Sequence, residues 1–259
     1  MVGKTVSSTI AAQSPHKFAW YNGEPSEYSA IMEGNNLLSA RGLGMFVEIT
    51  LSKCFLLFND GVNLRFHPAA GPIPAKHQLL VKFSDGTSLS TSVAMYGSVV
   101  CWEKSATYDN SYYQTALNKP SPLTDAFDET YFHSLITPGA VQKLPLKAVL
   151  ATEQRIPGLG NGCLQDILWV AQLHPRRKLN TLGEREIKRL FASIKGTLKT
   201  MTEQGGRSTE KDLFGQTGGY QVCMSAQSQG KPCPRCGSAI KKEAYLGGSI
   251  YTCPVCQLV

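Results

Sequence analysis

The chain has 259 residues and 42% of them are hydrophobic, a composition that supports a packed core and excludes a chain disordered throughout. No run approaches the roughly eighteen apolar residues of a membrane-spanning helix. The first residues, MVGKTVSSTIAAQSPHKF, contain no apolar stretch followed by a cleavage site, so no secretory signal is expected.

The net charge of +7 is unevenly distributed along the chain. Residues 1–130 hold 9 basic and 11 acidic side chains, whereas residues 131–259 hold 17 basic and 8 acidic ones. A basic second half indicates a polyanionic partner. Charge alone leaves open the alternative that this half simply presents a solvated basic face.

Short strands separated by turns dominate the first half. Five runs are rich in Val, Leu, Ile and aromatic residues, at 46–51, 54–58, 77–83, 88–93 and 98–102. Two of the separators, NDG at 59–61 and SDG at 84–86, are typical of β-hairpin turns. This spacing predicts an antiparallel β-sandwich.

A helical pattern begins near Lys147. Segments 144–156 and 163–173 flank a glycine-rich turn, and the second of them stops before His174-Pro175. A third helix is expected to start at a capping box formed by Thr181 and Glu184, and to end at Gly205. Its apolar stripe consists of Ile187, Leu190, Phe191, Ile194, Leu198 and Met201. Residues 205–220 form a polar, glycine-rich loop.

Four of the eight cysteines form two C-x-x-C pairs near the end of the chain. The pairs are Cys233 with Cys236 and Cys253 with Cys256, separated by sixteen residues. Four thiolates from two tight turns complete a tetrahedral site, which predicts one structural Zn²⁺ without an open coordination position. Two disulfides would instead require an oxidising compartment. The other cysteines, Cys54, Cys101, Cys163 and Cys223, are expected to be reduced core residues, which indicates the cytosol.

The turn PGLGNG at 157–162 precedes a helix start, where backbone N–H groups have no acceptor. With Gly160 offering no Cβ and Asn161 a short amide, this start could hold a phosphate. The alternative is an ordinary helix–helix turn with Asn161 as the N-cap.

Residues 158–182, GLGNGCLQDILWVAQLHPRRKLNTL, resemble the helix-two-turn-helix of the formamidopyrimidine-DNA glycosylase / endonuclease VIII family. Residues 230–257 are similar to its C-terminal zinc finger. Residues 1–8 and 121–127 resemble the first strand and the closing segment of its β-sandwich, and 83–97 its DNA-facing hairpin. The resemblance implies base-excision repair: an oxidised base is flipped out and removed, and the abasic strand is then nicked.

The resemblance also implies roles for particular residues. Asn161 and the backbone of Gly160 would clamp a phosphate, Tyr96 would act as an aromatic wedge, and His77 would lie at a DNA-contacting edge. Lys241 and Lys242 would contact DNA from the zinc finger, together with Lys231 and Arg235. The loop beginning at 203–209 resembles a mobile lid over the flipped base, and a flexible linker is the alternative.

Four departures from the family pattern stand out. The family uses an N-terminal proline amine followed by a glutamate, whereas this chain begins with Met1-Val2-Gly3 at the first strand. No catalytic residue is therefore assigned, and the expectation is a chain that starts downstream of the catalytic helix or one that has lost catalysis. Three family cations correspond to Met45 in the sandwich, Ala94 in the hairpin and Gly248 in the finger.

The sequence thus predicts an α+β multidomain protein. Its parts would be an N-terminal antiparallel β-sandwich (1–137), a helical domain with the helix-two-turn-helix (138–222) and a zinc ribbon (223–259). The expected function is that of a DNA glycosylase and abasic-site lyase acting on duplex DNA. The alternatives are a non-catalytic protein that binds damaged or bent DNA and an RNA- or ribosome-associated zinc-ribbon protein. A cytoplasmic monomer is expected, on the nucleoid when bound to DNA and away from membranes.

Overall fold

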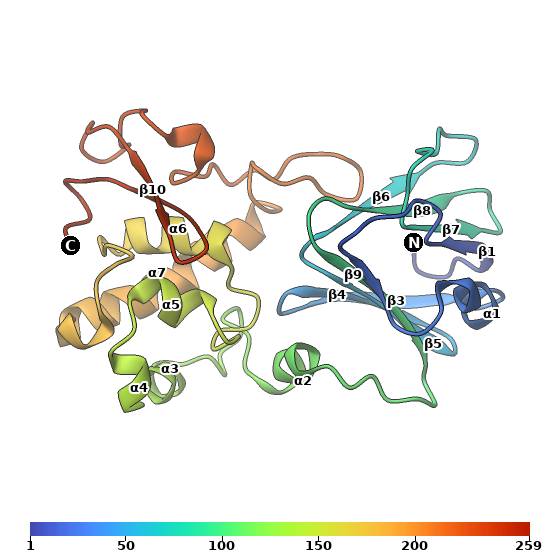
Figure 1. The fold of residues 1–259 in the computed structure, drawn as a ribbon, viewed down its shortest axis with the longest axis horizontal. Coiled ribbons are helices and arrows are strands. Elements are labelled where there is room, and N and C mark those ends of the chain that lie inside the picture. The colour runs from blue at the N-terminus through green and yellow to red at the C-terminus, as the bar shows by residue number, and fades with distance from the viewer. The chain divides into compact units, whose positions relative to one another are not determined.

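The structure is a computed structural model that describes residues 1–259 as two compact units (Figure 1). Unit 1 comprises Met1–Leu117 and Lys211–Gln216, and unit 2 comprises Asn118–Glu210 and Thr217–Val259. The division of the sequence at residues 137 and 222 is finer than this one and remains a prediction. No helix has the length and hydrophobicity required to cross a membrane.

Unit 1 is a β-sandwich of two sheets. One sheet has four strands, in the spatial order β1 (Val6–Ala11), β7 (Leu79–Phe83), β8 (Ser88–Val93) and β6 (Val62–His67). The other has five, in the order β2 (Ala19–Tyr21), β9 (Gly97–Glu103), β5 (Cys54–Asn59), β4 (Phe46–Leu51) and β3 (Leu37–Leu43). All neighbouring strands are antiparallel except β2 and β9, which run parallel. The sandwich prediction is confirmed, and that one pair is the exception.

The core of unit 1 lies between the sheets because side chains alternate along each strand. Leu56 and Phe58 of one sheet and Leu79 and Val81 of the other are almost completely buried in one cluster. The helix α1 (Tyr28–Met32), preceded by a 3₁₀ turn at Pro25–Glu27, packs against β1 and β9. Its Tyr28 hydroxyl donates to the carbonyl oxygen of Val99 over 2.9 Å.

The opposite face of the five-stranded sheet carries a second cluster, which the helix α2 (Ser111–Asn118) covers. Leu57 and Trp102 belong to this face, since they alternate with core positions. The Tyr113 hydroxyl of α2 donates to the buried carboxylate of Glu48 over 2.5 Å. Arg41 donates to the same carboxylate over 2.8 Å, so this buried charge is paired.

The two turns expected to close hairpins behave differently. The turn at 84–86 joins β7 and β8, which pair as predicted. The turn at 59–61 does not close a hairpin, because β5 and β6 belong to different sheets. Gly61 is required there for another reason: a Cβ at this position would lie 1.4 Å from the carbonyl oxygen of Tyr96. The glycine therefore serves close backbone packing rather than a hairpin turn.

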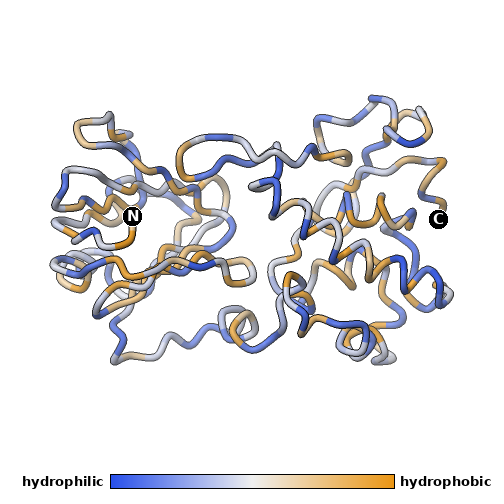
Figure 2. The backbone as a smooth tube through the Cα atoms, turned by 180° about the vertical axis from the view of Figure 1, so that it is seen from behind, coloured by the Kyte–Doolittle hydropathy of each residue, from blue (hydrophilic) through white to orange (hydrophobic).

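Unit 2 has a helical core and a C-terminal ribbon. Its helices are α3 (Glu129–Ile136), α4 (Gly139–Gln142), α5 (Leu146–Ala151), α6 (Asn161–Val170) and α7 (Glu184–Glu203), with a 3₁₀ turn at Leu179–Thr181. Helix α5 is shorter than the predicted 144–156, and α6 ends before the predicted residue 173. One hydrophobic cluster joins α3, α5, α6 and α7, including Phe132, Leu150, Ile167 and Leu190. Figure 2 shows hydrophobic stretches alternating with hydrophilic ones along the backbone of each unit.

Helix α7 starts at a different cap from the one predicted. The N-cap residue is Gly183, and the Glu186 carboxylate accepts its backbone N–H over 3.1 Å. Thr181 lies in the preceding 3₁₀ turn, where its hydroxyl donates to the carbonyl oxygen of Lys178. The capping box assigned to Thr181 and Glu184 is therefore wrong. The predicted end is confirmed, since Gly205 follows the C-cap with a φ of +71°.

The polar loop after α7 is built in two parts. Its neck belongs to unit 2, where Tyr220 donates its N–H to the Gly206 carbonyl and Ser208 donates to the Tyr220 carbonyl, over 3.0 and 2.8 Å. Its tip, Lys211–Gln216, belongs to unit 1. There the Phe66 N–H of β6 donates to the Leu213 carbonyl over 2.9 Å. Beyond the loop come a 3₁₀ turn (Ala226–Ser228) and the hairpin of β10 (Lys241–Tyr245) and β11 (Gly248–Thr252).

Candidate nucleic-acid interface

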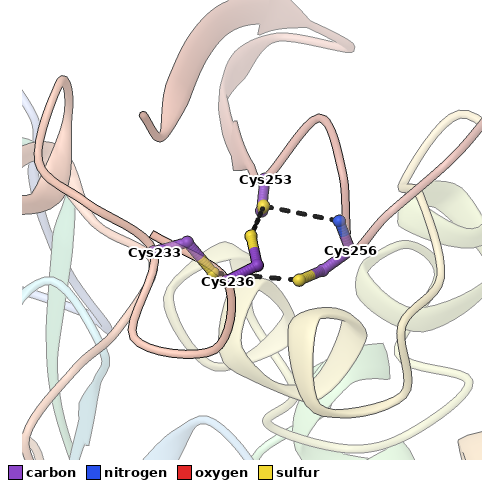
Figure 3. Close-up of side chains that lie close together, drawn as sticks. All are labelled: Cys233, Cys236, Cys253 and Cys256. Carbon is purple, nitrogen blue, oxygen red and sulfur yellow. Dashed lines mark hydrogen bonds between the residues drawn. The ribbon is translucent and has the colours of Figure 1, made fainter. Parts of the chain in front are cut away.

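The four predicted metal ligands converge at the base of the β10–β11 hairpin (Figure 3). The sulfur atoms of Cys233, Cys236, Cys253 and Cys256 all lie within 4.8 Å of one another. The Cys236 and Cys253 sulfurs are 3.3 Å apart, and those of Cys233 and Cys256 are 3.9 Å apart. Four sulfurs around a tetrahedral ion at about 2.3 Å would be separated by about 3.8 Å. The cluster could therefore hold a metal ion of this kind.

Local hydrogen bonds favour the metal-binding form of one ligand. Hydrogen bonds from the Ser238 backbone and side chain lower the pKa of the Cys236 thiol to about 6. The thiolate is the form that binds metals, so this cysteine is prepared as a ligand. The indole N–H of Trp169 in α6 donates to the sulfur of Cys233 over 3.4 Å. Hydrogen bonds of this kind orient a ligand from outside the coordination sphere.

Helix α6 holds the hairpin through a row of side chains spaced four residues apart. Asn161, Gln165 and Trp169 lie on one face of the helix because residues at i, i+4 and i+8 stack. The side-chain amide of Gln165 donates to the Ser249 carbonyl over 3.1 Å and accepts the Tyr251 N–H over 3.1 Å. Gln165 is only 1% exposed. It thus pairs with β11 much as a neighbouring strand would.

Asn161 belongs to the same row and to the expected phosphate cradle. Gly160 is the N-cap of α6 and Asn161 its first residue, so the N-cap role considered for Asn161 falls to Gly160. The Asn161 side chain instead donates to the Ser249 carbonyl over 3.2 Å and accepts from Gln165 over 3.1 Å. Gly158 has a φ of +78°, a conformation that favours glycine. The first N–H groups of α6 have no acceptor within the helix.

A hollow of about 230 Å³ opens beside this helix start. It is lined by Lys147, Ala148, Ala151, Thr152, Asn161, Leu246, Gly247 and Gly248. Lys147 is 5% exposed, and burial lowers the pKa of its ammonium group. The ammonium group donates to the Tyr245 carbonyl at the hairpin end. A Cβ on Gly248 would meet the Lys147 Nζ at 3.4 Å and the Asn161 Nδ2 at 3.8 Å.

The hollow therefore joins the helix start, the hairpin tip and a buried cation. Because positive groups and free N–H groups favour an anion, phosphate is the ligand that this arrangement suits. Sequence reasoning missed Lys147, Gln165 and Trp169. The spacing of Asn161, Gln165 and Trp169 was a usable signal, whereas nothing local distinguished Lys147 from a surface lysine. The family pattern has an arginine at the position of Gly248. In this chain the ammonium group of Lys147, from α5, lies beside that glycine.

The two ribbon lysines lie on opposite faces of β10, because neighbouring residues of a strand point to opposite sides. Both are exposed. Glu243 and Tyr245 share the face of Lys241, and both contact Arg176: its guanidinium lies 3.6 Å from the Glu243 carboxylate and 4.1 Å from the Tyr245 ring centroid. The side chains of Lys241 and Lys242 therefore leave the strand in opposite directions.

The remaining predicted contacts belong to unit 1. Tyr96 lies in the turn between β8 and β9 and is 49% exposed. His77 precedes β7 and is only 6% exposed, with its Nδ1 3.0 Å from the Pro74 carbonyl oxygen. The Nε2 of His77 is buried without a hydrogen-bond partner. Neither ring nitrogen of His77 is therefore free at the surface.

Comparison with known proteins gives the same assignment along the whole chain. The family model of the formamidopyrimidine-DNA glycosylase H2TH domain matches residues 119–212. Formamidopyrimidine-DNA glycosylase of Enterococcus faecalis is 29% identical over 268 residues, covering 99% of this chain and 91% of the relative. The enzyme of Exiguobacterium sibiricum is 29% identical over 228 residues, covering 83% and 79%.

Solved structures share the fold. Lactococcus lactis Fpg in complex with DNA containing an abasic site has a TM-score of 0.83 at 23% identity and covers 100% of this chain and 94% of its own. The MutM (Fpg) protein of Thermus thermophilus has a TM-score of 0.79 at 24% identity, covering 99% and 92%. This chain is thus similar along nearly its whole length to formamidopyrimidine-DNA glycosylases, and its residues 119–212 match their H2TH domain.

Proposed function

We propose that the protein is a base-excision repair DNA glycosylase and abasic-site lyase. It acts on duplex DNA with an oxidised base or an abasic site, as a cytoplasmic monomer that occupies the nucleoid when bound. The similar proteins are formamidopyrimidine-DNA glycosylases, which supports the proposed activity. The Lactococcus lactis complex contains DNA with an abasic site, which supports the proposed substrate.

One observation carries the proposal. The free N–H groups of α6, the amide of Asn161 and the ammonium group of Lys147 meet at one hollow, which the hairpin tip completes. Gln165 fixes the hairpin to the helix, so the groups are held in place before any ligand arrives. A rigid, positively charged hollow of this size suits a backbone phosphate and carries no sequence information.

Extrusion of a base explains why such a clamp is needed. The enzyme must hold the backbone while one nucleotide rotates out of the stack, and a side chain must take part of the space left behind. In unit 2 the hollow beside Asn161 would hold one phosphate. In unit 1 the exposed ring of Tyr96 would be the wedge, and His77 would lie at a DNA-contacting edge.

One Zn²⁺ would be bound by Cys233, Cys236, Cys253 and Cys256. Four thiolates leave no coordination position for water, so the ion would support the ribbon and would not activate a nucleophile. The ribbon and the segment before it share only a small hydrophobic cluster, including Met224, Ile240 and the buried cysteines. Metal binding and folding of the ribbon should therefore be one event.

Borohydride trapping on a duplex with a single abasic site tests the proposed function. An abasic-site lyase forms an imine between a protein amine and the sugar, and borohydride reduces it to a stable adduct. The expected result is one covalent adduct of protein and strand, formed only with the abasic duplex and through an amine of this chain, Met1 or a lysine, in place of the family's N-terminal proline. Tight binding to that duplex without an adduct would instead support the non-catalytic damaged-DNA-binding protein. Equal binding to intact duplex or to RNA would contradict both functions.

A further inference from the structure

An aromatic patch is exposed on unit 1, formed by Phe18, Trp20 and Tyr96. The rings of Trp20 and Tyr96 are stacked, with centroids 5.9 Å apart and an interplanar angle of 7°. Phe18 packs against Tyr96 with centroids 4.6 Å apart. Trp20 is 51% exposed and Tyr96 49%, and the neighbouring Met95 is 67% exposed.

The backbone around the patch is fixed. Strand β2 carries Trp20 and pairs with β9, which begins directly after Tyr96. The Gly97 N–H donates to the Phe18 carbonyl over 2.9 Å. Gly61 packs so closely against the Tyr96 carbonyl that any side chain at 61 would displace the turn. The two exposed rings are therefore preorganised, and little conformational entropy is lost when something stacks on them.

Exposure of these rings is not a general property of aromatic clusters in this chain. Trp102, Tyr108 and Tyr113 form a comparable cluster on the same unit, where Trp102 and Tyr113 are each only 7% exposed. Large apolar side chains that remain uncovered together mark a binding surface. A flat stacked pair suits a flat ligand, and both faces of a nucleic-acid base are flat and aromatic.

A cation lies at the edge of the patch. The Lys17 ammonium group is 5.2 Å from the centroid of the Phe18 ring, and it makes no ion pair in the structure. An unpaired cation beside exposed aromatic rings is complementary to a nucleotide, which joins a base to a phosphate. Besides Tyr96 the turn adds the apolar side chains of Ala94 and Met95, so it places no long polar side chain beside the rings.

We propose that Trp20 and Tyr96 form one stacking platform for the base that loses its partner when a nucleotide is extruded or missing. This inference rests on the proposed function and adds Trp20 as a positioning residue for DNA with an unpaired base. Tyr96 alone presents one ring. Trp20 lies parallel against one face of that ring and Phe18 packs against it at 45°, so the ring is held in place and the exposed side of the stack is ready to receive a base.

The test uses the full chain and a duplex with a tetrahydrofuran abasic analogue opposite 2-aminopurine. Stacking on an aromatic side chain quenches 2-aminopurine, so its fluorescence in the bound complex reports the platform. Fluorescence anisotropy on the same duplex, and on the intact one, gives the affinities. The variants are Trp20→Ala, Trp20→Phe and the control Tyr112→Ala, which removes a 51% exposed aromatic ring on α2.

We expect Trp20→Ala to bind the abasic duplex about 5- to 100-fold more weakly, the range for one base–aromatic stack. Its complex should be brighter, its affinity for intact duplex unchanged, and Trp20→Phe should restore most of both signals. Wild-type affinity and quenching in Trp20→Ala would overturn the platform while leaving the proposed function standing. A wild-type protein that does not prefer the abasic duplex would overturn the proposed function and the platform together. Altered self-association of Trp20→Ala with unchanged DNA binding would assign the patch to a protein contact and overturn the platform.

Discussion

Gln165 of α6 and Ser249 of β11 are joined by a hydrogen bond of 3.1 Å from the side-chain amide to the backbone carbonyl. The same carbonyl accepts from Asn161, the first residue of α6. The ribbon hairpin and the helix start are thus connected through the exposed Asn161 and the buried Gln165, and loss of the buried group would be costly. The position of the hairpin relative to the phosphate hollow depends on these few bonds.

Gln165→Ala should therefore loosen the hairpin from the helix. The substitution leaves the Tyr251 N–H without its acceptor and removes two further hydrogen bonds. We expect a loss of about 1–3 kcal/mol in the free energy of unfolding of the ribbon. Hydrogen exchange at the Tyr251 amide should quicken. Gln227→Ala, an exposed glutamine before the ribbon, is the control and should change neither measurement. Unchanged exchange at Tyr251 would contradict the role given to Gln165.

Removal of the metal should unfold the ribbon while the sandwich of unit 1 remains folded. We expect about one zinc per wild-type chain by elemental analysis, and none tightly held by Cys253→Ser. The Cys253→Ser ribbon should lose exchange protection, and DNA binding should weaken sharply. Cys223→Ser is the matched control, because Cys223 lies near the cluster but is not among the four ligands. Retention of wild-type DNA affinity in Cys253→Ser would show that the ribbon is not part of the clamp.

Lys147→Met should affect DNA binding and stability in opposite directions. Burial lowers the pKa of Lys147, so its charge is held at a cost in the free protein. The pKa of Lys147 is lower in the folded state than in the unfolded state. Burial of the charged ammonium group therefore lowers the stability of the wild-type protein at neutral pH, and this loss diminishes as pH rises through the folded-state pKa. We expect the variant to have an equal or higher urea midpoint at pH 7.

The same variant should bind DNA about tenfold more weakly, and the slope of log affinity against log salt should fall by about one. Lys188→Ala removes an exposed cation from α7 and is the control for net charge. If Lys147→Met and Lys188→Ala weaken binding equally, Lys147 has no specific contact with phosphate.

Glu186 should stabilise α7 in a pH-dependent manner. Its carboxylate accepts from the Arg177 guanidinium over 2.5 and 3.0 Å and from the Gly183 N–H, and Arg177 lowers its pKa. A lowered folded-state pKa means that the stabilisation is complete above the unfolded-state pKa and is lost as pH falls through the folded-state value. Glu186→Gln should lower stability by about 1 kcal/mol at pH 7.

Urea unfolding at neutral pH and near pH 3 checks this prediction. The difference between wild type and Glu186→Gln should shrink at the lower pH, where the carboxylate becomes protonated. Glu184→Gln, in the same helical turn but 79% exposed, should leave the urea midpoint nearly unchanged at both pH values. A difference that stays constant with pH would contradict the charge-based role of Glu186.

Much of the fold could be predicted because local patterns determine it. The strands at 46–51 and 88–93 match β4 and β8, since a short run of strand-forming residues bounded by turns is a short-range signal. The four cysteines that could hold a metal ion were equally predictable, because C-x-x-C spacing places two thiolates on one turn. The hairpin expected at 59–61 failed for a long-range reason: β6 pairs with β8, a partner that the turn does not specify.

The candidate site was less accessible to sequence reasoning. Lys147 lines the hollow only because α5, the start of α6 and the hairpin tip come together in the fold, which no local pattern predicts. Trp20 and Tyr96 are 76 positions apart and become neighbours because β2 pairs with β9. At Thr181 a local pattern was misleading. Its spacing to Glu184 fits a capping box, but α7 begins two residues later, with Gly183 as its N-cap.

The most direct test of the account is equilibrium binding to two duplexes that differ at one position, one intact and one with a tetrahydrofuran abasic analogue. Anisotropy at several salt concentrations gives both affinities and their salt dependence. We predict tighter binding to the abasic duplex and a log–log salt slope of about −2 or steeper, since several phosphates are contacted. Equal affinities for the two duplexes would contradict the proposal that this chain holds DNA around an extruded or missing base.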